Sequence, residues 1–179
     1  MRFWCGLPVL AIVATLTAAN GAAAAPALPA AACSVAAALP PELADWARNA
    51  SSKTIYAYGD DLGADWSPLG PARTALPLHK FESLRYGVAP ERKPDVYKFG
   101  GMIPVAVKKA GRLIVALDAG AWIDLVRDGT VMKSVTHGHG PACSGIRKMV
   151  EFDVKPGRYQ LQIVNAPAAS IHAMAVLRD

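Results

Sequence analysis

The sequence predicts an all-β fold, an antiparallel jelly-roll-like sandwich with a short N-terminal helix. Apolar-rich segments follow one another after residue 95, and Gly, Asp-Gly or Pro-Gly separates them. Apolar and polar side chains alternate strictly over 149–155 and 158–164, which is the period of a strand with one buried face. The segments recur about every ten residues, a spacing typical of sandwiches.

The first residues predict export. Arg2 precedes an apolar run at 7–16, and a tract of small residues follows at 18–25. A positive start, a short apolar run and an Ala-x-Ala site are typical of a secretory signal peptide, here residues 1–24. The run is too short to span a bilayer. We therefore expect a periplasmic or secreted protein with no membrane span once the signal is removed.

Residues 25–40 are rich in Ala and Pro and are expected to form a spacer before a single β-sandwich domain at 41–179. Pro40 and Pro41 precede 42–48, where a proline at the first position and acidic residues in the first turn favour a short helix. Turn formers dominate 51–70, and short pieces within 74–88 are expected as edge strands.

Seven segments are expected to be strands: 96–107, 112–118, 121–127, 130–136, 147–154, 158–164 and 170–177. In the two alternating segments, Phe152 and Leu161 should face the core, whereas Glu151 and Gln162 should face solvent. The pairs 128–129 (Asp-Gly) and 156–157 (Pro-Gly) are tight-turn signals.

The charge pattern argues against a nucleic-acid partner. The net charge is +5, and it falls to +4 without the signal peptide, which contains Arg2 and no acidic residue. Lys and Arg are scattered among Asp and Glu, and no run is longer than the pairs at 108–109 or 147–148. A mild, dispersed basic excess does not form the continuous patch that nucleic-acid binding requires.

Two cysteines remain after export, and we expect a disulfide between Cys33 and Cys143 because the compartment is oxidising. This bond would tie the N-terminal tail to the glycine-rich loop at 137–148. The alternative is that Cys143 acts as a nucleophile or a metal thiolate, although an unpaired thiol would oxidise after export.

The glycine-rich loop contains a candidate metal site at His137 and His139. In extended backbone these two imidazoles point to the same side and can reach one Cu, Zn or Fe ion. A third ligand is required, and the candidates are His79, His172, Asp124 and the carboxylates at 60–61. Two histidines and a carboxylate are the ligand set of non-haem iron oxygenases. The alternative is a structural loop in which the imidazoles bond to backbone.

A ligand-binding surface is the second candidate site. Arg147 and Lys148 offer cations suited to carboxylates or phosphates, Trp122 offers a stacking surface and Asp124 a hydrogen-bond acceptor. Each residue also has a structural alternative: Trp122 in the core, Asp124 as an acceptor at a strand end, and the two cations at a solvated strand start. We expect a small molecule, a glycan or an envelope protein as the partner.

Two stretches resemble known families. The runs 111–117 (GRLIVAL), 122–129 (WIDLVRDG) and 155–163 (KPGRYQLQI) resemble bacterial pre-peptidase C-terminal domains, which are secreted, accessory jelly-roll modules. The stretch 137–148 (HGHGPACSGIRK) resembles small exported proteobacterial proteins, some of which are labelled homogentisate 1,2-dioxygenase. That label implies a mononuclear metal oxygenase that uses His137 and His139, but the metal ligands of the ring-cleaving enzyme do not match this chain residue by residue.

The sequence therefore predicts an exported, non-enzymatic binding or accessory module of the cell envelope. The alternatives are a metal-binding protein or oxygenase that uses His137 and His139, and a purely structural envelope protein. A metal site requires a third ligand close to both histidines. A sugar or peptide site requires a concave surface with an exposed aromatic side chain.

Overall fold

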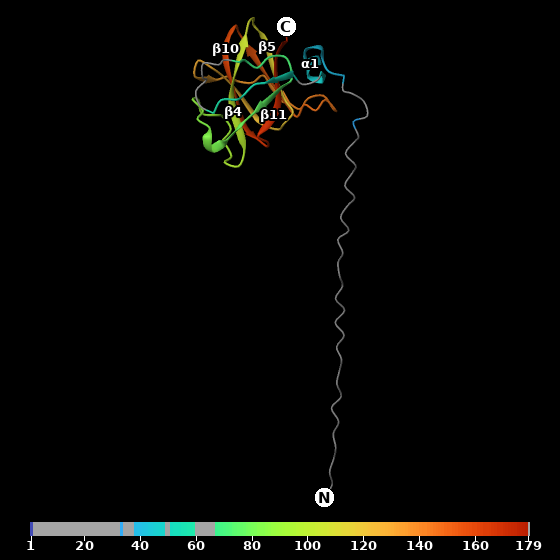
Figure 1. Ribbon diagram of the computed structural model, residues 1–179, viewed down its shortest axis with the longest axis vertical. Coiled ribbons are helices and arrows are strands. Elements are labelled where there is room, and N and C mark those ends of the chain that lie inside the picture. The colour runs from blue at the N-terminus through green and yellow to red at the C-terminus, as the bar shows by residue number, and fades with distance from the viewer. Residues whose placement is uncertain (2–32, 34–37, 49–50, 60–66, 179) are drawn as a thin grey trace. The chain divides into compact units, whose positions relative to one another are not determined.

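The structure is a computed structural model that describes Met1, Cys33 and residues 38–48, 51–59 and 67–178 (Figure 1). Cys33–Asp179 forms one compact unit. The signal peptide predicted at 1–24 and most of the spacer predicted at 25–40 lie outside the described residues. Within the described part of the chain, no helix is both long and apolar enough to cross a membrane.

Short helices at the start are followed by strands to the end of the described chain. In order, the elements are η1 (Pro41–Leu43), α1 (Ala44–Ala47), β1 (Ser51–Thr54), β2 (Thr74–Pro77), β3 (His79–Lys80), η2 (Phe81–Ser83), β4 (Phe99–Val107), β5 (Gly111–Leu117), β6 (Trp122–Arg127), β7 (Thr130–Val131), β8 (Thr136–Gly138), β9 (Lys148–Val154), β10 (Gly157–Ala166) and β11 (Ser170–Arg178). The short helix predicted near the N-terminus is confirmed as η1 and α1.

The strands form two sheets with jelly-roll connections. Sheet A has the order β1-β2-β11-β5-β9-β8, and sheet B has the order β3-β4-β10-β6-β7. Only β1 and β2 pair in parallel, and the other pairs are antiparallel. The long strands alternate between sheets along the chain, as Figure 1 shows for β4 and β10 of sheet B and β5 and β11 of sheet A. The predicted jelly-roll-like sandwich is confirmed.

Two strand boundaries differ from the sequence prediction. The segment predicted as one strand at 130–136 is split, because the chain leaves sheet B after β7 and joins sheet A at β8. Among the turn formers of 51–70, β1 pairs with β2, so that β2 is not an edge strand. The turn signal at 128–129 is confirmed, because Asp128 and Gly129 have φ values of 50° and 74°.

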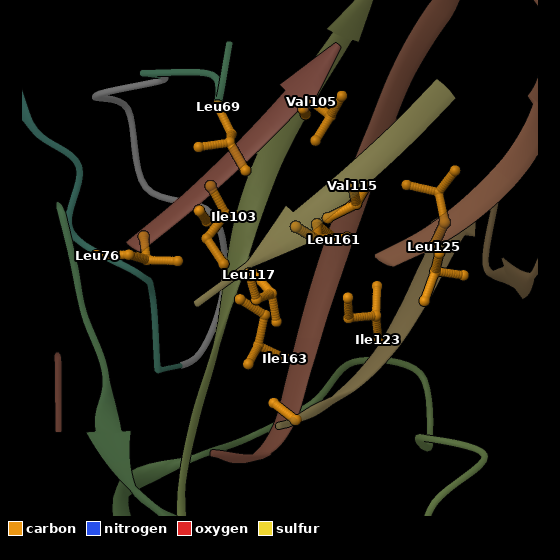
Figure 2. Packing of buried hydrophobic residues seen from close by; sticks show 14 of the residues in the cluster. Leu69, Leu76, Ile103, Val105, Val115, Leu117, Ile123, Leu125, Leu161 and Ile163 are labelled. Atoms are coloured by element: carbon orange, nitrogen blue, oxygen red, sulfur yellow. The ribbon is translucent and has the colours of Figure 1, made fainter. Parts of the chain in front are cut away.

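The core fills the space between the sheets. Figure 2 shows Val115 and Leu117 of sheet A with Ile103, Leu161 and Ile163 of sheet B, and these side chains are fully buried. Replacing one such aliphatic side chain with Ala costs about 2–5 kcal/mol, because transfer energy is lost and a cavity remains. The predicted inward face of each alternating strand is therefore confirmed.

The predicted outward positions Glu151 and Gln162 are buried, with 9% and 0% of their surfaces exposed. Both point away from the central core, but other segments cover them. Arg112 and Arg178 donate to Glu151 at 3.2 and 2.8 Å, and the amide of Gln162 donates to a backbone carbonyl at 3.0 Å. The expectation of solvent exposure is wrong because an alternating pattern does not reveal what lies above the outer face.

The N-terminal segment covers the outer face of sheet A. Leu43 and Trp46 are buried in a second apolar cluster, whose other buried members are Ile114, Ala116, Ile146 and Met174. The indole Nε1 of Trp46 donates to the carbonyl of Ser144 at 2.9 Å. The predicted disulfide between Cys33 and Cys143 is confirmed, with a Cα–Cα distance of 5.4 Å. The segment is therefore held at the glycine-rich loop by a covalent bond and a buried indole.

The loop at 84–98 lies over the outer face of sheet B. The hydroxyl of Tyr86 donates to the carbonyl of Ile163 at 2.8 Å. Asn165 accepts from the amide of Asp95 at 2.7 Å and donates to the carbonyl of Lys93 at 3.1 Å. These bonds attach the loop to β10, and they bring its charged residues next to β6.

Candidate functional site

Strand β6 places Trp122 and Asp124 on the same side of sheet B. Ile123, between them, belongs to the core, so the two polar-tipped side chains point away from it. The indole Nε1 of Trp122 donates to Oδ1 of Asp124 at 2.7 Å. Trp122 is partly exposed, whereas Asp124 exposes 2% of its surface. The indole is therefore fixed in orientation by a buried carboxylate.

The carboxylate of Asp124 is fully engaged. Its second oxygen, Oδ2, accepts from the backbone amide of Glu91 in the covering loop at 3.0 Å. Burial raises the pKa of Asp124 above its ordinary value, and the bonds from Trp122 and Glu91 oppose this shift. The pKa of Tyr86 is also raised, first by burial and then by the negative charge of Asp124. Asp124 is thus a buried carboxyl group whose hydrogen bonds fix the indole of Trp122 and attach the covering loop.

Sheet A contributes Lys148 and His137 to the same place. Lys148 lies two and four residues before Val150 and Phe152, so it shares their inward face at the end of β9. His137 pairs in register with Val150 and is exposed. Strand β7 pairs with β6 only at 126–127, so that within the described residues the first half of β6 has an open edge. This edge gives Lys148 access to Trp122.

These side chains line a small pocket, here called the indole pocket. Its polar and aromatic-polar lining consists of Glu91, Trp122, Asp124, Ser134, His137 and Lys148, and its apolar lining of Ile123, Met132, Val150 and Phe152. The guanidinium of Arg92 lies 5.2 Å from the centre of the Trp122 ring, and the ammonium of Lys148 lies 6.0 Å from it. Cations at these distances are attracted by the ring, and each contact is worth about 0.5–1 kcal/mol at an exposed site.

The pocket volume, about 20 Å³, limits what can enter. A space of this size holds about one water-sized group. Side chains that can donate a hydrogen bond line the pocket at Ser134, His137 and Lys148, while Asp124 already accepts two hydrogen bonds. The arrangement suits one oxygen-bearing, electron-rich group at the end of a larger ligand.

Arg147 and His139 do not line the indole pocket, although both were candidates. Arg147 is exposed, and its carbonyl accepts a hydrogen bond from Nδ1 of His139 at 2.8 Å. A carbonyl only accepts, so Nδ1 of His139 carries the proton. His139 thus bonds to backbone within its own loop, as the structural alternative predicts, while His137 faces the pocket.

In the part of the chain that the structure describes, no group of three or more His, Cys, Asp or Glu side chains is placed to hold a metal ion. Of the proposed third ligands, His79 bonds to the carbonyl of Ala57 at 2.7 Å and His172 bonds to Asp118 at 2.8 Å. The carboxylates at 60–61 lie outside the described residues. Metal binding by His137 and His139 stays a prediction.

Sequence reasoning missed the contribution of the covering loop. Glu91 and Arg92 lie in a charged, proline-bearing stretch, and nothing in their local pattern indicates which strand they approach. The inward position of Lys148 could have been predicted from the sequence. Lys148 lies two residues before Val150 and four before Phe152, and side chains at this spacing share one face of a strand.

No protein-family profile matches the sequence, and comparison with curated proteins also yields no match. The resemblance to pre-peptidase C-terminal domains stays a prediction. The evidence for function is the indole pocket itself.

Proposed function

We propose that the protein is an exported, non-enzymatic binding module of the cell envelope, and that its indole pocket recognises a carboxylate-bearing glycan or peptide. The observation that carries this proposal is the convergence of Trp122, Asp124, His137 and Lys148 from two sheets on one pocket. These residues lie up to 26 positions apart in the chain (148 minus 122).

The chemistry of the pocket favours an anionic oxygen over a neutral one. Arg92 and Lys148 place two cations against the Trp122 ring, and hydrogen bonds from cations to carboxylates are roughly twice as strong as neutral ones. Because the pocket holds about one water-sized group, one carboxylate oxygen would enter it, and the rest of the ligand would lie outside on the partly exposed indole and the neighbouring surface. A terminal carboxylate on a glycan or a peptide has this shape.

Calorimetric titration with matched pairs of probes tests the proposal. A glucuronate-terminated disaccharide is compared with its glucose counterpart, and an acidic peptide with its amide. We expect the carboxylate member of at least one pair to bind more tightly. Lys148→Met should weaken that binding about tenfold or more, because a charged hydrogen bond contributes about 1.5–3 kcal/mol.

The matched control is Lys80→Met, which removes an exposed lysine on β3 that does not line the pocket. It should bind as the unmodified protein does. Equal binding of the charged and neutral probes would refute carboxylate recognition. An unchanged affinity in both Lys148→Met and Trp122→Phe would place the ligand elsewhere.

A further inference from the structure

A second, larger hollow lies at the corner of the sandwich next to the β4–β5 turn. It is formed by the end of β4, the start of β5, residues 175–177 of β11 and the segment 69–71, and its volume is about 470 Å³. We call it the corner cleft. Its size falls within the range of about 300–1,000 Å³ that is usual for small-molecule sites.

The strand pairing explains why the sandwich opens here. Within the described residues, β2 pairs with β11 only as far as Ala173, and β3 pairs with β4 only at 99–100. Beyond these points the segment 69–71 takes the place of an edge strand, since Leu69 donates to the carbonyl of Pro104 at 2.9 Å and Gly70 accepts from Ala175 at 2.8 Å. The cleft is therefore part of the fold.

The lining of the corner cleft is apolar apart from lysine. Val105, Leu113 and Ala175 expose 2%, 3% and 6% of their surfaces, so they are core side chains seen from one end. Among the described residues, the charged side chains of the lining are Lys108 and Lys109, at the β4–β5 turn, and no described lining residue is acidic. An apolar wall with Lys108 at its mouth is complementary to an amphiphile with a negative head.

We propose that the corner cleft binds a single-chain fatty-acid carboxylate, with its alkyl tail against the apolar wall and its head group beside Lys108. The walls offer few polar side chains to a glycan, whereas each methylene that leaves water for this surface gains free energy. Lys108 is exposed at the mouth and can pair with a carboxylate that remains in contact with water. This site is separate from the indole pocket and does not depend on its function.

Calorimetric titration of the disulfide-bonded protein with decanoate and dodecanoate, below their micelle concentrations, is the first test. Two added methylenes should tighten binding about fifteenfold, since each buried methylene is worth about a fourfold gain. Dodecyltrimethylammonium, with the same tail and a positive head, should bind more weakly than dodecanoate. Equal affinities for decanoate and dodecanoate, or equal affinities for dodecanoate and dodecyltrimethylammonium, would overturn the proposal.

Two variants locate the site. Gly70→Phe adds a bulky side chain where an added Cβ has no neighbour within 4 Å and φ is outside the left-handed region, so the fold should persist while the cleft narrows. This variant should weaken the binding of both fatty acids at least tenfold. Lys108→Glu should weaken the binding of dodecanoate by up to about fivefold and strengthen that of dodecyltrimethylammonium, since an exposed pair is worth up to about 1 kcal/mol.

Lys80→Glu is the charge-matched control, because Lys80 is exposed and lies outside the cleft lining. It should leave both affinities unchanged. If Gly70→Phe does not fold, Lys108→Glu still tests the site, because its affinity for dodecanoate should fall while its affinity for dodecyltrimethylammonium should rise. Unchanged binding in Lys108→Glu, or the same change in Lys80→Glu, would refute the cleft as the site.

Discussion

Removal of the disulfide should destabilise the protein strongly. The bond links residues 110 positions apart. In the chain-entropy treatment, a loop of this length restricts the unfolded chain enough to stabilise the fold by about 5 kcal/mol. The folded state keeps the contacts of Leu43 and Trp46 with sheet A after the bond is lost, so the effect should arise mainly in the unfolded state. The double variant Cys33→Ser, Cys143→Ser isolates the contribution of the disulfide to the free energy of unfolding.

Urea unfolding followed by far-UV circular dichroism provides the measurement. We expect the free energy of unfolding to fall by about 3–5 kcal/mol. The slope of this free energy against urea concentration should become steeper, because the uncrosslinked chain exposes more surface when it unfolds. Unmodified protein in reductant should match the double variant. Replacing Cys143 with Gly instead of Ser should recover about 1 kcal/mol, because φ at this position is 61°. A loss below about 1 kcal/mol would refute the entropic account.

Three further predictions concern single side chains. Tyr159→Phe should cost about 1–3 kcal/mol in thermal or urea unfolding, because the buried hydroxyl donates to the carbonyl of Lys155 at 2.7 Å and accepts from its amide at 2.9 Å. Trp46→Ala should cost about 3–5 kcal/mol, and Trp46→Phe, which keeps an aromatic ring, distinctly less. For Asp124, burial raises the folded pKa above its ordinary value of 3.8, so stability from this group is present below pH 3.8 and is lost as pH rises through the folded pKa. Asp124→Asn should flatten that part of the pH–stability curve, and an unchanged slope would contradict the shift.

Local patterns predicted the strands because every second side chain of a half-buried strand faces the core. Apolar residues therefore recur at every second position of the sequence. The turn at Asp128 and Gly129 was predictable for the same reason, since a two-residue turn with positive φ selects these residues. The fate of Glu151 and Gln162 was not predictable locally. Glu151 is paired with Arg112 of β5 and Arg178 of β11, and Gln162 is bonded to the loop at 84–98, which returns to the sheet from a distant part of the chain.

The candidate site was predictable only in part. Trp122, Asp124, His137 and Lys148 were selected by residue type, but the two histidines looked equivalent in sequence. Both line a shallow hollow beside β8, but His137 alone of the two also lines the indole pocket, because it lies in register with Val150, whereas His139 lies past the end of the strand and bonds to Arg147. Strand register, which a single sequence does not specify, decides which imidazole reaches the pocket.

The burial of Asp124 explains why the ligand should bind through cations. Among the described residues, the donors to this carboxylate are neutral, the indole of Trp122 and the amide of Glu91. Its field extends to the pocket mouth, where Arg92 and Lys148 lie against the indole. An incoming carboxylate must therefore outweigh this buried charge by binding the cations directly. A neutral ligand would leave the charges of Arg92 and Lys148 without a new partner. This difference gives the pocket a physical basis for discriminating between a carboxylate and a neutral ligand.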